Sequence, residues 1–412
     1  MAAEDFSKYG IVLALLSAIL YQLVFKNLIW VTMGVGRELQ PISDFANYKC
    51  RKLQDSRLQA CEDMWLSENT RQLFLACSKS ASRKHWMPNV GRVNASGRGL
   101  DDAIIAMDID KRKGDSFAYR VLSTPGFAGV NGMGQLHLVG LTGRESASKI
   151  ELLLVNAQPA FDASTNKVLD SPDFVIESFK TDKKHKASSL QHQQTLRHPV
   201  ITSPNNVAFS SAVSDKDGFY FTNDHGDASS GFRHSIAPYI GNGGVAYCSS
   251  STSKPTCHIV DDGYHFPNGL ISDKDDPSIL FVPSAWSGGI YVFKANGANR
   301  LERLAFIDIP YPIDNLSQDK NGDIWAAALP KAFETLGAFD EPLTSLASST
   351  IFRIKEKKNT ESGALEYEME KVLEDRDKEV LPGATTVVHD VTTGRLFLSG
   401  VTSPFITVCD RV

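Results

Sequence analysis

Five side chains that carry oxygen recur along the sequence, each at the start of a short apolar segment. They are Glu62, Asn205, Asn268, Asp314 and Asn315. Carboxylate and amide oxygens are the usual ligands of hard divalent cations, and a set with two carboxylates and three neutral amides suits calcium better than magnesium. If the segments that follow these residues converge on one axis, the chain builds a calcium site.

The sequence from about Tyr48 onward repeats one unit. A polar start leads into an apolar run, a turn rich in Asp, Asn or Gly, and a second apolar run, as in Asn268–Ile271 followed by Ile279–Val282. Six such units recur about every 45 to 75 residues, which is typical of a β-propeller with four-stranded blades. The innermost strands of such blades face a central channel, so their first residues should meet at one mouth of it. We therefore predict an all-β, six-bladed β-propeller, with a β-sandwich of unrelated repeats as the alternative.

The N-terminal segment differs in kind from the rest of the chain. From Gly10 to Val35 it is almost wholly apolar, and the run to about Met33 reaches the ~20 residues that a bilayer core requires. No clear cleavage site follows, so an uncleaved signal anchor is favoured over a removed signal peptide. A buried core helix is disfavoured because the segment has no polar face at helical period. We predict a transmembrane signal-anchor helix in residues 1–36 and a six-bladed β-propeller domain in residues 37–412.

Composition excludes several classes of function. The 412 residues are 42% hydrophobic and 22% charged, as in an ordinary globular protein, and the net charge is −5. No stripe of Lys and Arg with interleaved aromatic residues occurs, which argues against nucleic-acid binding. No Gly-x-Ser-x-Gly motif and no Cys/His pairs at zinc spacing occur, which argues against a serine hydrolase and a zinc site.

The six cysteines indicate the compartment. Cys248 and Cys257 flank a polar stretch that reads as a hairpin turn, so we predict a disulfide between them. Cys50 and Cys409 lie near the two ends of the propeller, where a disulfide would lock the ring. For Cys61 and Cys77, free buried thiols are the simplest interpretation. Two disulfides imply an oxidising compartment.

A glycosylation acceptor agrees with that compartment. Asn94-Ala95-Ser96 lies in a loop rich in Gly and Ser, and such acceptors are used on the luminal side of the secretory pathway. We therefore predict glycosylation at Asn94 and a membrane-anchored protein of the secretory pathway whose propeller is luminal or extracellular.

Several short motifs occur in order after the N-terminal segment and together carry a family resemblance. They are Arg37-Glu38-Leu39-Gln40-Pro41, Glu62-Asp63, Thr195-Leu196-Arg197-His198, Thr222-Asn223-Asp224-His225, Phe266-Pro267-Asn268-Gly269, Asp314-Asn315 and Gly322-Asp323-Ile324-Trp325. In this set the chain resembles the serum paraoxonase/arylesterase family of calcium-dependent, six-bladed propellers, over about residues 37–412.

The resemblance implies two calcium sites. Glu62, Asn205, Asn268, Asp314 and Asn315 would hold the catalytic ion. A second, structural ion would take Asp63, the backbone carbonyl of Val139 and the position of Asn206, where the family has an aspartate. The lost charge at Asn206 is expected to weaken the second ion.

The resemblance also implies a mechanism. His137 matches the proposed general base above the catalytic ion, although a histidine buried in the core is the commoner role of such a residue. The family's companion histidine corresponds to Ala157, and a third histidine to Leu329. Phe266 matches a wall of the substrate pocket, and Thr386 is expected near the channel mouth.

The predicted function is calcium-dependent hydrolysis of small aryl esters or lactones. Calcium would polarise the carbonyl and His137 would activate water. Two alternatives stay open: a propeller like gluconolactonases or strictosidine synthases, and a non-catalytic binding propeller stabilised by calcium. Ala157 and Leu329 favour the non-catalytic alternative.

Overall fold

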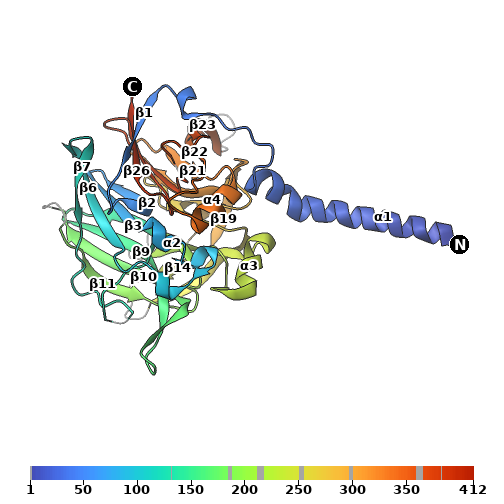
Figure 1. Ribbon diagram of the computed structural model, residues 1–412, viewed down its shortest axis with the longest axis horizontal. Coiled ribbons are helices and arrows are strands. Elements are labelled where there is room, and N and C mark those ends of the chain that lie inside the picture. Colours follow the sequence, from blue (N-terminus) through green and yellow to red (C-terminus); the bar gives the residue numbers. More distant parts are fainter. Residues whose placement is uncertain are drawn as a thin grey trace.

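The computed structural model of the protein is shown in Figure 1. It describes residues 2–130, 132–183, 188–210, 218–249, 255–296, 300–358, 365–381 and 383–412. These residues form six four-stranded antiparallel sheets and one two-stranded sheet.

The six sheets are the blades of the predicted propeller. Blade 1 contains β2 (Gln59–Ser67), β3 (Gln72–Ser78), β6 (Ala103–Lys113) and β7 (Ser116–Val121). Blade 2 contains β8 (Leu138–Glu145), β9 (Lys149–Asp162), β10 (Lys167–Asp182) and β11 (Gln191–Leu196). Blade 3 contains β12 (Pro204–Phe209), β13 (Phe219–Asn223), β14 (Gly243–Ser249) and β15 (Thr256–Tyr264).

The second half of the ring repeats the pattern. Blade 4 contains β16 (Ile271–Ser272), β17 (Ile279–Pro283), β18 (Ile290–Ala295) and β19 (Leu301–Ile307). Blade 5 contains β20 (Ile313–Gln318), β21 (Ile324–Ala328), β22 (Ser349–Lys358) and β23 (Leu365–Asp375). Blade 6 contains β24 (Thr386–Asp390), β25 (Arg395–Ser399), β26 (Ile406–Arg411) and, from the other end of the chain, β1 (Tyr48–Leu53).

The first strands of neighbouring blades contact one another, as β2 does with β8 and β24, so they line the channel. Apolar side chains fill the space between blades. For example, Val155 and Ile176 of blade 2 pack in one buried cluster with Phe219 and Phe221 of blade 3. The propeller therefore brings the first residues of these inner strands close together. The sequence-based prediction of six blades is confirmed.

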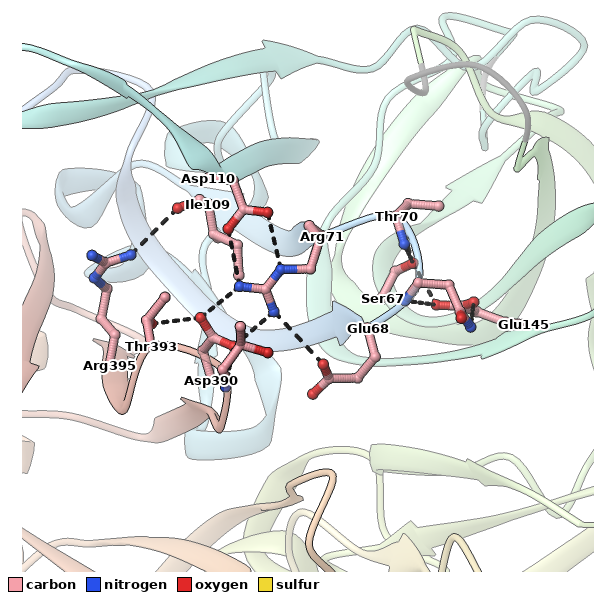
Figure 2. Close-up of polar contacts among 12 residues, drawn as sticks. Ser67, Glu68, Thr70, Arg71, Ile109, Asp110, Glu145, Asp390, Thr393 and Arg395 are labelled. Carbon is pink, nitrogen blue, oxygen red and sulfur yellow. Dashed lines mark hydrogen bonds and ion pairs between the residues drawn. The ribbon is translucent and has the colours of Figure 1, made fainter.

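Two features close the ring between blades 1 and 6. Strand β1 pairs with β26, with Cys50 opposite Cys409, and these cysteines form a disulfide. Figure 2 shows the second feature: Arg71, at the turn between β2 and β3, donates two hydrogen bonds to Asp390 at the end of β24, both at 2.7 Å. The same guanidinium also pairs with Asp110 of β6, at 3.0 Å.

Three disulfides occur among the described residues, and two of them were predicted. Cys248 and Cys257 join β14 to β15, although residues 250–254 of the stretch between them lie outside the described residues. The third, Cys61–Cys77, corrects the expectation of free thiols. A bulge between Gln59 and Asp63 shifts the pairing of β2 with β3 and brings the two cysteines together.

The helices lie outside the blades. The longer ones are α1 (Ala2–Leu20), α3 (Gly231–Ile240) and α4 (Ala332–Asp340), and a short α2 (Ser80–Arg83) follows β3. Three 3₁₀ turns, Ile42–Asp44, Pro88–Val90 and Ala95–Gly97, and the small hairpin of β4 (Trp86–Met87) and β5 (Arg92–Val93) complete the structure. Figure 1 shows α1 projecting away from the propeller on the side where α3 and α4 lie.

The predicted anchor is not confirmed. Among the described residues, no helix is both long enough and apolar enough to cross a bilayer. Helix α1 ends at Leu20, and the remainder of the apolar run is divided between two π-helical segments, Tyr21–Phe25 and Leu28–Thr32.

Candidate metal centre and cavity

The five predicted calcium ligands lie together at the channel axis. Glu62 belongs to β2, Asn205 to β12, and Asp314 and Asn315 to β20, while Asn268 precedes β16. All five have exposed fractions of 6% or less. The Nδ2 of Asn315 donates to Glu62 Oε1 at 3.0 Å and to the Glu62 carbonyl at 3.1 Å, which joins residues 253 positions apart.

The side-chain amides of Asn205 and Asn268 turn their nitrogens toward protein acceptors and leave their oxygens unpaired. Asn205 Nδ2 donates to Asp224 at 3.4 Å, and the Asn268 amide hydrogen-bonds Asp314. As a result, Glu62 Oε2, Asn205 Oδ1 and Asn268 Oδ1 are buried with no protein partner. An unsatisfied buried polar atom costs about 1–3 kcal/mol. Three unpaired acceptors in one ring are therefore the arrangement that a bound cation would satisfy.

The charges at the ring support the same interpretation. Burial, and then the nearby charges of Asp63 and Asp314, raise the pKa of Glu62 well above its usual value. Burial, and then Asp63, raise the pKa of Asp314 in the same way. Carboxylates buried together are costly without a positive partner. In composition and charge, this set of donors fits a hard divalent cation such as calcium.

Amides, rather than additional carboxylates, complete the ring. In the part of the chain that the structure describes, no group of three or more His, Cys, Asp or Glu side chains is arranged to hold a metal ion. The ring has two carboxylates, Glu62 and Asp314, and its remaining oxygens belong to asparagines. This composition separates it from zinc and other transition-metal sites.

The position predicted for a second ion is different, because Asp63 is already satisfied. Its Oδ1 accepts hydrogen bonds from the Met64 amide at 2.8 Å and the Thr386 hydroxyl at 3.2 Å. Its Oδ2 accepts from the Leu141 amide at 3.0 Å and from Asn206 Nδ2 at 2.9 Å. An amide donor therefore faces Asp63 where a second ion would need an acceptor. The residues here do not fit a second calcium.

A cavity of about 350 Å³ opens above the ring. Glu62, Asn205, Asn268 and Asp314 form its floor. Its walls are mostly apolar and include Met87, Phe266, Trp286, Leu329, Phe339 and Val401. The volume is in the range of small-molecule sites. Thr385 lines this cavity, whereas the predicted pocket residue Thr386 points its hydroxyl toward Asp63.

A second cavity of about 440 Å³ lies on the other side of the ring. Consecutive residues divide the two spaces: Glu62 and Asn205 line the first cavity, whereas Asp63 and Asn206 line the second. Only the first cavity receives the unpaired oxygens, so we regard it as the candidate substrate site.

The predicted base His137 lies behind the wall of this cavity. Its exposed fraction is 2%, and it is not among the residues that line the cavity. Its Nε2 has no protein partner, and its ring packs against Trp86. Burial, with smaller contributions from Arg98 and Arg83, lowers the pKa of His137 to about 3. The Trp86 indole donates to the carbonyl of Ala157, so this region is filled by tryptophan and alanine.

Two other histidines do line the cavity, and sequence reasoning gave neither of them a role. His225 is the second residue after β13, and His234 belongs to α3. The signal for His225 was its place in the Thr222-Asn223-Asp224-His225 motif. For His234 there was none, because α3 was not predicted.

Asn94 and Val139 were also predicted as site residues. Asn94 is exposed, and its Oδ1 accepts a hydrogen bond from Ser96 Oγ at 2.6 Å, so glycosylation there stays a prediction. Val139 is fully buried in β8.

Part of the chain is similar in sequence to known proteins. A family model described as arylesterase matches residues 165–398. Serum paraoxonase/arylesterase 2 of Gallus gallus is 29% identical over 167 residues, which is 40% of this chain and 44% of that protein. The match thus spans less than half of the relative's length.

Similar solved structures are more distant in sequence. The periplasmic gluconolactonase of Pseudomonas aeruginosa is 12% identical, with 85% of this chain and 81% of that chain covered and a TM-score of 0.46. An auxiliary nutrient binding protein of Bacteroides ovatus is 10% identical, with 89% and 77% covered and a TM-score of 0.47. The family model extends over more than half of the 412 residues and includes Asn205, Asn268, Asp314 and Asn315, so this chain belongs to the arylesterase family.

Proposed function

We propose that this protein is a calcium-dependent hydrolase of small aryl esters or lactones. The observation that carries the proposal is the set of three unpaired, buried oxygens at the floor of a cavity of small-molecule size. Membership of the arylesterase family supports the same reaction class.

The ion would be held by Glu62, Asn205, Asn268 and Asp314. Asn315 would fix the orientation of Glu62 through its Nδ2. The Oδ1 of Asn315 already accepts one hydrogen bond, from Asn206, and its second lone pair could bind the ion. When bound, calcium would supply positive charge for the carbonyl oxygen that becomes negative as water attacks. The apolar walls would bind the aryl or alkyl part of the ester and exclude bulk water.

The sequence-based candidate for the base is His137. Its unpaired Nε2 could accept a proton, but the residue would have to reach past the wall of the cavity to meet a substrate. His137→Gln is therefore a necessary variant in any test of the mechanism.

The cavity walls separate two of the candidate substrate classes. Phe266, Phe339 and Trp286 present apolar surface above the ring. Such walls favour aryl or alkyl groups over a polyhydroxylated sugar lactone, whose hydroxyls would lose hydrogen bonds with water. We therefore rank aryl esters and alkyl lactones above sugar lactones.

We further propose that the chain holds one calcium ion rather than two. The four donors to Asp63, one of which is the Asn206 amide, supply the cross-links that a second ion would otherwise make. Asn206 Nδ2 also donates to Asn315 Oδ1 at 3.0 Å, so this network supports the catalytic ring directly.

The three disulfides indicate an oxidising compartment, consistent with a secretory or extracellular location. We propose that the N-terminal helix and nearby exposed apolar residues hold the propeller against a membrane. These residues include Trp30 of the N-terminal segment, Phe232 and Ile240 of α3, and Phe333 and Leu336 of α4.

The test is hydrolysis of phenyl acetate and of a panel of alkyl and sugar lactones by the full chain, with calcium or with chelator. We expect activity that needs calcium and falls at least about 100-fold in Glu62→Gln. The matched control is Glu368→Gln, an exposed residue of the outer strand β23, which should be unaffected. A folded wild type that binds calcium but hydrolyses none of the panel would instead support a non-catalytic binding propeller.

A further inference from the structure

Two histidine rings stack on each other in the wall of the candidate substrate cavity. The ring centroids of His225 and His234 are 3.6 Å apart and the rings are nearly parallel, at 6°. Both residues line the cavity, although both are more than nine-tenths buried. One follows a blade strand and the other lies on α3, so two separate elements bring these imidazoles together beside the floor.

Asp224 fixes the orientation of the first ring. His225 Nδ1 and Asp224 Oδ1 are 2.7 Å apart, and the Asp224 carboxylate is fully buried. The other carboxylate oxygen accepts from Asn89 Nδ2 at 2.7 Å and from Asn205 Nδ2 at 3.4 Å. A carboxylate acceptor at Nδ1 favours the tautomer with the proton there, which leaves Nε2 as an acceptor.

The surroundings also hold His225 in place. Its backbone amide donates to Ser203 Oγ at 3.0 Å, and its ring makes an edge contact with Phe266 at 5.0 Å between centroids. Among the described residues, the imidazole itself hydrogen-bonds to Asp224 alone. The imidazole of His225 is therefore held in a fixed orientation in the cavity wall, with Nε2 available as a hydrogen-bond acceptor.

His234 has a different environment. Its Nε2 is buried and has no protein partner. Burial, and then the neighbouring His225, lower the pKa of His234 to about 4, so this ring is neutral near pH 7. Two charged imidazoles stacked face to face would repel each other. The neutral His234 ring therefore forms a flat support for the ring of His225.

We propose that Asp224, His225 and His234 form the proton-transfer group of this cavity, with His225 as the general base. The inference rests on the proposed hydrolysis. As the water oxygen forms its bond to the ester carbonyl carbon, a water O–H bond breaks and the proton moves to His225 Nε2. The proton then passes to the leaving alcohol or phenol oxygen as the ester C–O bond breaks. Asp224 and His234 are positioning residues.

The arrangement also accounts for a substitution in the chain. Ala157 stands where the resemblance places a companion for His137, and the Nε2 of that histidine has no partner among the described residues. His225 has both a carboxylate partner and a place on the cavity wall. The proposed general base thus lies in blade 3 and packs against α3, rather than in blade 2.

The first test does not require turnover. The full chain is treated with diethyl pyrocarbonate, which acylates accessible neutral imidazole nitrogens, and the labelled histidines are located by mass spectrometry. We expect His225 to be labelled and His137, which lies behind the wall, to resist. Labelling of His137 with none at His225 would overturn the inference.

The second test compares variants under saturating calcium. In His225→Gln, kcat for phenyl acetate should fall about 100-fold or more, as expected for loss of a general base, with KM and calcium affinity nearly unchanged. In His225→Ala, added imidazole should restore part of the rate, which a purely structural role would not allow. His234→Phe keeps the stack and should lose less than about tenfold. The control His258→Gln, on an exposed strand, should match wild type.

The outcomes separate this inference from the proposed function. Full activity in His225→Gln, with activity still lost in Glu62→Gln, would overturn the role of the histidine pair and leave the hydrolase intact. A wild type that hydrolyses no ester would remove both. If the His225 variants do not fold, the labelling of wild type decides.

Discussion

The oxygens around the channel axis differ in how they are paired. Glu62, Asn205 and Asn268 each have one unpaired side-chain oxygen. In Asp63, by contrast, each of the two carboxylate oxygens accepts two hydrogen bonds. The two neighbouring residues of β2 therefore differ in role. Glu62 can bind a cation, whereas Asp63 accepts hydrogen bonds from residues of other blades. The difference arises from Asn206, whose amide donates where a carboxylate would repel.

We expect the variant Asn206→Asp to gain a calcium site. The change replaces a donor to Asp63 with a second buried carboxylate, so the calcium-free variant should lose about 3 kcal/mol of stability. Calcium should restore that loss and bind with one additional equivalent. Thermal unfolding and calcium titration measure both quantities. Asn321→Asp, on an exposed turn, is the control, and an unchanged stoichiometry in Asn206→Asp would contradict the prediction.

Residue types and order were enough to predict the ring but not the histidine pair. The oxygen-bearing residues stand at equivalent points of a repeat, so the symmetry of a propeller brings them together without knowledge of side-chain contacts. His234 reaches the cavity only because α3 folds back over the channel mouth. That helix is short, begins at Gly231 and contains Pro238, so its sequence has little helical signal.

At the level of the strands, the stability of the propeller depends on how blade 6 joins the two ends of the chain. The Cys50–Cys409 disulfide joins positions 359 residues apart, whereas Cys248 and Cys257 are 9 apart. In the chain-entropy model, the longer loop makes its disulfide more stabilising by about 3 kcal/mol.

We therefore expect Cys50→Ser/Cys409→Ser to lower the free energy of unfolding more than Cys248→Ser/Cys257→Ser does. Urea unfolding of the two double variants provides the comparison. Equal losses would show that closure of the ring does not depend on the terminal disulfide.

The ion pair in Figure 2 gives a pH-dependent prediction for the same closure. Burial alone would raise the pKa of Asp390, but the hydrogen bonds from Arg71 and Thr393 lower it below its usual value. A carboxyl group with a lowered pKa contributes stability that is complete above its unfolded value of about 3.9 and is lost as the pH falls through the folded value.

Asp390→Asn should therefore cost about 1.5–3 kcal/mol near pH 7. The difference in stability between wild type and variant should shrink below about pH 4, where wild type also loses the charge. Urea unfolding at several pH values measures it. A difference that does not change with pH would mean that Asp390 acts through shape and not through charge.

The blades could be predicted from the sequence, but the exact pairing of neighbouring strands could not. Six blades follow from period and turn chemistry, which are local. The Cys61–Cys77 bond depends on a bulge that shifts β2 against β3, and Ala60 there has a φ of 45°, which nothing in its residue type indicates. Both predicted disulfides lie at ordinary paired positions.

At the scale of the whole molecule, apolar surface gathers near the candidate substrate cavity. Tyr239 and Leu336 line the cavity, and Phe232, Ile240 and Phe333 of the same two helices are exposed. Figure 1 shows α1 leaving the propeller on this side. A membrane against this face would place apolar esters next to the cavity.

We expect the full chain to bind phosphatidylcholine vesicles, and the triple variant Phe232→Ser/Ile240→Ser/Phe333→Ser to bind at least about tenfold more weakly, because each side chain contributes about 1–2 kcal/mol of apolar burial. Met369→Ser, an exposed change in the outer strand β23, is the control. Vesicle sedimentation measures binding. Equal binding by the triple variant would exclude α3 and α4 from the membrane contact.

The central claim is that one calcium ion is held by the ring. Crystals of the full chain grown with calcium, and examined by anomalous scattering, test it directly. We predict a single peak at the axis, about 2.4 Å from Glu62 Oε2, Asn205 Oδ1 and Asn268 Oδ1, and none beside Asp63. A peak between Asp63 and Asn206, or no peak among the three unpaired oxygens at saturating calcium, would contradict the account.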